Sequence, residues 1–163
     1  MTLDRAIIEG ELDIIDRNLK FLQDVQRLTQ KKFLASYGDI QATKHSLLEI
    51  VEACIDVANY VISVKGFTRA ESYSEMFATL GRERVLEVGL AESLQEMAKF
   101  RDLLVHRYAE VDNTRVLKIV KHNLNDVREF ERQIQKLIRQ ESGAPQPFGS
   151  PGFGIPPDTH INR

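Results

Sequence analysis

Apolar residues recur every three or four positions through most of this 163-residue chain, and this helical period constrains the fold more than any other feature. In the first stretch, from about residue 4 to residue 35, the spacing places one set of side chains on a single face: Ile8, Ile15, Leu19 and Leu22. The alternating pattern of a half-buried strand extends over no useful length, and the sequence contains no internal repeat. The sequence therefore predicts an all-α protein.

Four later stretches are also expected to be helical. The stretch from about residue 40 to 65 has an apolar face broad enough for a central helix with several neighbours, and Gly66 is expected to end it. A short helix is expected at 74–80, and two long ones at about 90–108 and 112–140. We predict an up-and-down helical bundle of four long helices and one short helix.

The bundle is expected to form one domain that spans residues 1–142. From residue 143 to 163 the sequence is dominated by glycine and proline, which disfavour helix and strand, so we expect a flexible tail. The amino end lacks the pattern of a signal peptide, and no apolar run approaches membrane-spanning length. The single cysteine, Cys54, fits a reducing compartment. We therefore expect a cytoplasmic protein without membrane attachment.

Arg101 interrupts the apolar face of the helix expected at 90–108. Its neighbours on that face are apolar: Leu90, Leu94, Met97 and Leu104. A buried guanidinium is costly unless it is paired or faces a functional cleft. His106 follows five residues later and Tyr108 two residues after that. Because local rules tend to be broken where sites are built, we interpret the segment from Arg101 to Tyr108 as a candidate functional site.

Arg101 and His106 together have the chemistry needed to cleave RNA. An arginine that binds a phosphodiester and a histidine that moves protons near neutral pH suffice for attack by the 2′-hydroxyl without a metal ion, which leaves a 2′,3′-cyclic phosphate. Asp102 precedes His106 by four residues, so its carboxylate could orient the imidazole. On a straight helix Arg101 and His106 point about 140° apart. The helix would have to unwind near His106, or a second helix or a second protomer would have to complete the site.

A structural explanation of the same segment stays open at this point. The charged residues around His106 could form a solvated face: Asp102, His106, Arg107 and Glu110. Arg101 could then be paired inside the bundle by Asn123 or by an acidic neighbour. Short motifs of common residues also recur by chance.

Any contact with RNA has to be local, because the net charge of −2 gives no overall basic footprint. Lys99, Arg107 and Arg115 are the candidate RNA contacts near the motif, although a basic patch could also attract an acidic protein. The histidines and the cysteine show no metal-ligand spacing, and the glycines form no phosphate-binding loop. We therefore expect neither a metal ion nor a cofactor.

The sequence resembles the HEPN superfamily, and specifically the HepT-like toxins, whose signature Arg-x4-His-x-Tyr is matched by Arg101, His106 and Tyr108. The similarity covers roughly residues 1–140 and includes three further stretches in order and spacing: Ile-Asp-Val-Ala-Asn-Tyr-Val-Ile, Ser-Tyr-Ser-Glu-Met-Phe-Ala-Thr-Leu and Leu-Gln-Glu-Met-Ala-Lys-Phe-Arg-Asp-Leu-Leu-Val-His-Arg-Tyr. Asp102 departs from the pattern, because asparagine is common there, and it adds a negative charge near the expected RNA phosphate. Ala70-Glu71 also departs, where a proline is common.

The resemblance implies a ribonuclease toxin that works as a homodimer. In the family the two motifs form a composite, metal-independent endoribonuclease site at the dimer interface, where Arg101 would bind and polarise the scissile phosphate and His106 would act as general acid or base. The implied partner is a minimal nucleotidyltransferase antitoxin, which attaches AMP to Tyr108 and so blocks the RNA cleft. The alternative is a non-catalytic helical subunit that binds RNA or a nucleotide, or docks the nucleotidyltransferase. Asp102 and the acidic balance of the chain keep that alternative open.

Overall fold

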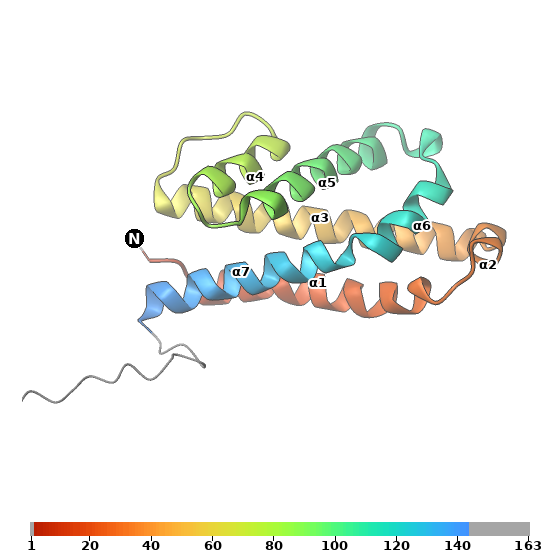
Figure 1. Ribbon diagram of the computed structural model, residues 1–163, viewed down its shortest axis with the longest axis horizontal. Coiled ribbons are helices and arrows are strands. Elements are labelled where there is room, and N and C mark those ends of the chain that lie inside the picture. Colours follow the sequence, from red (N-terminus) through yellow and green to blue (C-terminus); the bar gives the residue numbers. More distant parts are fainter. Residues whose placement is uncertain (1, 144–163) are drawn as a thin grey trace, which may run out of the picture.

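The computed structural model describes residues 2–143, and every regular element in this part of the chain is a helix. The elements are α1 (Arg5–Gln26), α2 (Gln30–Ala35), α3 (Tyr37–Lys65), α4 (Tyr73–Arg82), α5 (Val88–His106), a 3-10 turn η1 (Tyr108–Glu110), α6 (Asn113–His122) and α7 (Leu124–Ser142). The long helices α1, α3, α5 and α7 alternate in direction along the molecule (Figure 1). The predicted all-α, up-and-down bundle is confirmed. Apart from Gly143, the tail expected at 143–163 lies outside the described residues.

The central helix is α3, which lies between the layer of α1 and α7 and the layer of α4 and α5 (Figure 1). Its apolar residues are buried on several sides of the helix, and Ile50, Cys54 and Val61 are fully inaccessible. Burial raises the pKa of the Cys54 thiol, which behaves as a small core residue. Gly66 adopts a left-handed backbone with φ of 68°, which ends α3 as expected. The broad apolar stripe thus corresponds to a helix with neighbours on several sides.

The stretch expected as one helix at about 4–35 is divided into α1 and α2. The reason is local capping: the Thr29 hydroxyl accepts a hydrogen bond from the Lys32 backbone N–H at 3.2 Å and starts a new helix. Ser36 caps α3 in the same way, by accepting from the Asp39 backbone N–H at 3.2 Å. These two caps turn the chain at one end of the bundle.

The stretch expected as one helix at about 112–140 is divided at Asn123 into α6 and α7. Asp112 caps α6, since its carboxylate accepts from the Thr114 backbone N–H at 2.9 Å. The buried spacing continues across the break from Val120 to Leu124, so periodicity alone does not reveal it. Within residues 2–143 no helix combines the length and the apolar content that crossing a membrane requires.

Close packing fixes α5 against α4 and connects this pair to the rest of the core. A β-carbon at Gly81 would lie 2.9 Å from the β-carbon of Ala91, so the glycine permits the close approach of α4 and α5. Phe77 of α4 meets Phe130 of α7 edge to face, with ring centroids 6.3 Å apart. The amino-terminal part of α5 is therefore packed closely against α4.

One acid pair, formed by exposed Asp16 and half-buried Glu131, makes the stability of the bundle depend on pH. Half-buried Glu131 on α7 has a pKa raised to about 8, chiefly by desolvation and then by its hydrogen bond to Asp16 and the charge of Asp16 on α1. A carboxyl with a raised folded pKa binds its proton more tightly in the folded state than in the unfolded state. The contribution of protonated Glu131 to the free energy of unfolding is therefore fully present below the unfolded pKa of about 4.5, and it is lost as the pH rises toward 8.

We expect Glu131→Gln to raise the free energy of unfolding at pH 8 by about 1 kcal/mol, well below the full value of the shift because solvent screens this half-exposed group. The gain should be much smaller at pH 5, where the parental carboxyl is protonated in the folded state and about a quarter of the unfolded chains are protonated as well. Urea unfolding at the two pH values measures it, with exposed Glu92→Gln on α5 as the control. An equal gain at both pH values would contradict this assignment.

Candidate active site

Arg101 lies on α5 with its side chain largely buried and its guanidinium paired with two carboxylates. The side chain is 14% exposed, Nε donates to Oε1 of Glu52 on α3 at 2.5 Å, and Nη1 donates to Oδ1 of Asp102 at 3.0 Å. The guanidinium carbon lies 4.7 Å from the ring centroid of Tyr73. Burial opposes the charge, but the two carboxylates outweigh it, so the pKa of Arg101 is raised. Arg101 is therefore a fixed cation, paired by an acidic neighbour and not by Asn123.

Arg101 and His106 line the same cavity of about 600 Å³. The cavity lies between the last turns of α5 and the loop that leads into α4, and its wall includes Ser72, Tyr73 and Met76. On the α5 side Asp102 and Val105 lie at helical positions between Arg101 and His106, so the two motif residues flank the opening. A cavity this wide accommodates their angular separation without unwinding of the helix.

His106 is the last residue of α5, and its side chain is exposed. The helix ends there because the next residue, Arg107, leaves the helical backbone conformation, although its N–H still donates to the Leu103 carbonyl at 2.8 Å. The sequence suggested that Asp102 orients His106. Among residues 2–143, the hydrogen bond found for Asp102 comes from Arg101, and none joins Asp102 to His106. In this arrangement Asp102 supports the arginine.

Tyr108 lies outside the cavity, against the beginning of α3. It belongs to the 3-10 turn that follows α5, and its hydroxyl donates to the side-chain carbonyl of Gln41. The Nζ of Lys44 lies 4.4 Å from the centroid of its ring. Burial and, to a smaller extent, Tyr37 raise the pKa of Tyr108, so its hydroxyl is protonated near neutral pH. A single chain thus brings together Arg101, Asp102 and His106 but holds Tyr108 apart from them.

The three candidate RNA contacts do not line this cavity. Lys99 pairs with Glu96 at 2.9 Å, and Arg107 lies 3.9 Å from Glu110. Arg115 is on α6, on another side of α5. Their expected role in binding RNA stays a prediction. Residues 2–143 contain no group of three or more His, Cys, Asp or Glu side chains placed to hold a metal ion.

Two residues of the site were not predicted from the sequence. Glu52 precedes Arg101 by 49 residues, and the sequence does not show which face of α3 meets α5. Tyr73 left a signal, since it lies in the Ser-Tyr-Ser stretch that resembles the HepT pattern. Its ring now covers the Arg101 guanidinium and explains why an aromatic residue is placed there.

The antiparallel helical bundle has the fold of a solved HEPN toxin, and Arg-x4-His-x-Tyr, which spans the end of α5 and the turn after it, is the motif by which the sequence resembles that class. A family model described as "Ribonuclease HepT-like" matches residues 15–134, which is most of the chain. The chain belongs to this HepT-like ribonuclease family, as its sequence resemblance indicated.

Two relatives and one solved structure show how far the similarity extends. The tRNA nuclease HepT of Aphanizomenon flos-aquae (strain 2012/KM1/D3) is 26% identical over 136 residues, which cover 83% of this chain and 92% of the relative. The mRNA nuclease HepT of Shewanella oneidensis is 29% identical over 124 residues, or 76% of this chain and 92% of the relative. The tri-AMPylated Shewanella oneidensis HEPN toxin, solved in complex with MNT antitoxin, superimposes with a TM-score of 0.75 at 25% identity and covers 82% of this chain and 99% of that chain.

Proposed function

We propose that this protein is a metal-independent endoribonuclease toxin in which Arg101 holds the scissile phosphate and His106 transfers protons. The observation that carries the proposal is the shared cavity of about 600 Å³, which receives a buried cation from one side and an imidazole from the other. Two relatives named as a tRNA nuclease and an mRNA nuclease support the same chemistry. The substrate class is therefore RNA.

The geometry suits cleavage by the 2′-hydroxyl of the RNA itself. Glu52 and Asp102 each accept one N–H of Arg101, which leaves guanidinium donors for the phosphate oxygens. The 2′-oxygen attacks phosphorus, the bond from phosphorus to the 5′-oxygen breaks, and His106 takes the 2′-hydroxyl proton or protonates the leaving oxygen. The products are a 2′,3′-cyclic phosphate and a 5′-hydroxyl. Each of these steps uses only groups of the protein and the RNA.

We also propose that the working site is composite, formed by two protomers. Cleavage needs one group to accept a proton and another to donate one, and each chain supplies a single histidine to this cavity. On the wall of the cavity, Tyr73 and Val105 are exposed large hydrophobic residues, at 38% and 43% exposure. A second copy of the chain related by a twofold axis would cover them and bring a second His106 to the same cleft.

The proposed control of this toxin is transfer of AMP to Tyr108 by a partner nucleotidyltransferase. The Tyr108 oxygen would attack the α-phosphate of ATP, forming a phosphodiester as pyrophosphate leaves and the hydroxyl proton is lost. Tyr108 is 41% exposed and lies in the 3-10 turn that follows α5. The AMP adds bulk and negative charge where RNA would approach. The structure of the tri-AMPylated relative with its MNT antitoxin supports this control.

A second candidate function is a non-catalytic subunit that binds RNA or docks the nucleotidyltransferase. One observation favours it: Arg101 is already engaged by Glu52 and Asp102, and Tyr73 covers one face of its guanidinium. Two carboxylates beside the arginine weaken its attraction for a phosphate.

The test is incubation of the purified protein with labelled RNA in excess EDTA, with intact mass measured on the same sample. We expect cleavage to 2′,3′-cyclic phosphate ends, because the mechanism uses no metal ion. Loss of cleavage in EDTA with recovery on addition of Mg²⁺ would overturn metal independence. An absence of cleavage at the unmodified mass would overturn the ribonuclease proposal and favour the non-catalytic subunit.

A further inference from the structure

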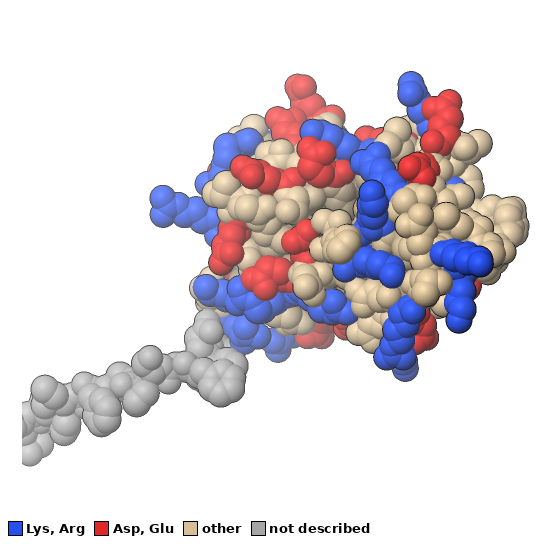
Figure 2. Space-filling model, turned by 45° about the vertical axis from the view of Figure 1, so that its right-hand side comes forward, with Lys and Arg blue, Asp and Glu red and all other residues tan. Residues whose placement is uncertain are grey.

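Helix α6 carries a basic surface that the proposed cavity does not use. Its four basic side chains are exposed: Arg115, Lys118, Lys121 and His122. The segment 113–122 contains no acidic residue, and within residues 2–143 no ion pair neutralises Lys118 or Lys121. Figure 2 shows basic side chains in a vertical band right of centre on this side of the molecule, with acidic ones gathered mainly on the left. The chain is acidic overall, so this concentration of positive charge is local.

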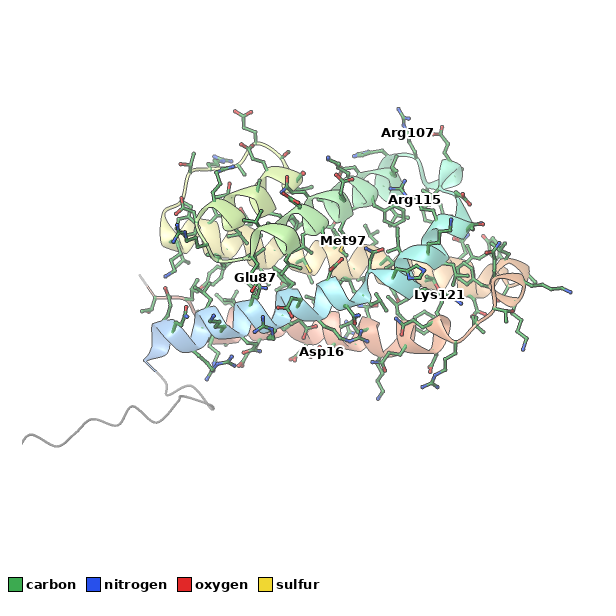
Figure 3. The ribbon with its side chains drawn as sticks, viewed as in Figure 1. Asp16, Glu87, Met97, Arg107, Arg115 and Lys121 are labelled. Carbon is green, nitrogen blue, oxygen red and sulfur yellow. The ribbon has the colours of Figure 1, made fainter. Side chains whose placement is uncertain are left out.

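A pocket of about 230 Å³ adjoins this surface, between α5 and α6. Its apolar wall is formed by Met97, Phe100 and Ile119, and Ser93 and Asn123 supply hydrogen-bonding groups. One carboxylate, that of Glu96, also lines the pocket, and it is paired with Lys99 at 2.9 Å. The guanidinium of Arg115 lies over the Phe100 ring at 5.2 Å from its centroid. In the view of Figure 3, Arg107, Arg115 and Lys121 follow one another down the right-hand part of the molecule, with Met97 beside them.

We propose that this pocket and the basic residues of α6 bind a single-stranded part of the RNA substrate away from the point of cleavage. The inference rests on the proposed ribonuclease function. One base enters the pocket and stacks on the Arg115 guanidinium, whose other face is held by Phe100. Lys118 and Lys121 bind phosphates of the adjoining nucleotides.

The pocket and the cavity share α5 as a common wall. Phe100 and Asp102 point about 160° apart on this helix, so the two sites open on opposite faces of it. The helix ends only six residues after Phe100, or about 9 Å along its axis. A single strand of RNA that crosses the end of α5 beside exposed Arg107 therefore reaches both the pocket and the cavity. A path of this kind needs several nucleotides, within the range of about 4–16 that single-strand binders use.

The pocket favours RNA over an acidic protein as the occupant of this surface. Positive charge alone would attract either partner. At about 230 Å³, the pocket is smaller than the cavities that enclose drug-sized ligands, and a planar guanidinium on its wall suits one ring. Polar groups at Ser93 and Asn123 can reach the edge of a base, as in the recognition of single-stranded RNA.

The experiment compares cleavage of two RNAs, one of about 12 nucleotides and one of about 2, the shorter lying below the range of about 4–16 nucleotides that single-strand binders use. We expect Lys118→Gln with Lys121→Gln to lower kcat/KM about tenfold on the longer RNA and to leave the shorter one unchanged. Binding of the longer RNA should lose about 0.7 from its logarithmic salt slope for each phosphate contact removed. Arg115→Lys keeps the positive charge but removes the planar guanidinium on which the base would stack. It should therefore lower kcat/KM on the longer RNA about fivefold and leave the salt slope unchanged.

Lys136→Gln on α7 makes the same change of charge away from this surface and serves as the matched control. If the parental protein cuts neither RNA, the proposed function fails. If it cuts both and the lysine variants match it on the longer RNA, the inference drawn from α6 is overturned. If those variants cut normally but no longer bind the nucleotidyltransferase, α6 is a protein-docking surface and the RNA assignment is likewise overturned.

Discussion

His106→Ala is expected to lower the rate of RNA cleavage by about 10²–10⁴-fold, the usual contribution of a positioned general acid or base. The loss should fall on kcat, because the imidazole acts on protons that move only during the reaction. The fold should not change, since His106 is an exposed residue at the last position of α5 and its removal leaves no internal cavity. Cleavage of labelled RNA, beside circular dichroism and size-exclusion chromatography, measures both effects.

The matched control is His45→Ala, which removes an exposed histidine on α3 that pairs with Glu49 at 3.2 Å and lies outside the cavity. Arg101→Lys is the companion variant. It retains a positive charge between Glu52 and Asp102, whereas alanine would leave two carboxylates facing each other. If His106→Ala cut RNA at the parental rate while His45→Ala did not, the assignment of the acid and base to this cavity would be wrong.

Tyr108→Phe is expected to remain fully active when the partner nucleotidyltransferase and ATP are added, whereas the parental protein loses its activity. The substitution removes only the oxygen that would form the bond to AMP, and the ring retains its contact with Lys44. The lost hydrogen bond to Gln41 is at an exposed position, so its effect on stability should be small. Intact mass and RNA cleavage, taken on the same reaction, report modification and inhibition together.

Tyr37→Phe is the matched control for this experiment, because it removes a tyrosine oxygen that is more exposed and lies at the start of α3 near Tyr108. It should gain mass in AMP units and lose activity like the parental protein. The assignment of the modification to Tyr108 is contradicted if Tyr108→Phe gains the same mass as the parental protein. Loss of cleavage by Tyr108→Phe without any partner would instead place its hydroxyl in the cleavage step.

The bundle was predictable because burial leaves a periodic record in the sequence. The broad apolar face of 40–65 corresponds to central α3, and Gly66 ends it in the expected left-handed conformation. The breaks after α1 and at Asn123 depend on single caps and on local backbone angles, which a continuing apolar spacing conceals. The sequence thus predicted which segments are helical, but it did not predict the two breaks within them.

The site was predictable only within α5. The sequence identified Arg101 as a polar residue in an apolar slot, and the structure shows why the slot tolerates it: Glu52 pairs with it and Tyr73 covers it. Both partners come from other helices, and their positions depend on how α3 and α4 turn toward α5. An ideal helix extended to Tyr108 would have placed the tyrosine beside Arg101. The helix ends at His106, and the tyrosine turns away to Gln41.

The end of α5 inside the motif gives its residues unequal resistance to local unfolding. Arg101 lies within the helix, and two carboxylates and the Tyr73 ring contact its guanidinium. Tyr108 belongs to an exposed 3-10 turn of three residues, and its side chain contacts Gln41 and Lys44. Local unfolding of that turn costs little free energy compared with global unfolding, and it leaves the hydrogen bonds of α5 intact. The proposed transfer of AMP to Tyr108 would therefore require only this short turn to open, while Arg101 keeps its contacts with Glu52 and Asp102.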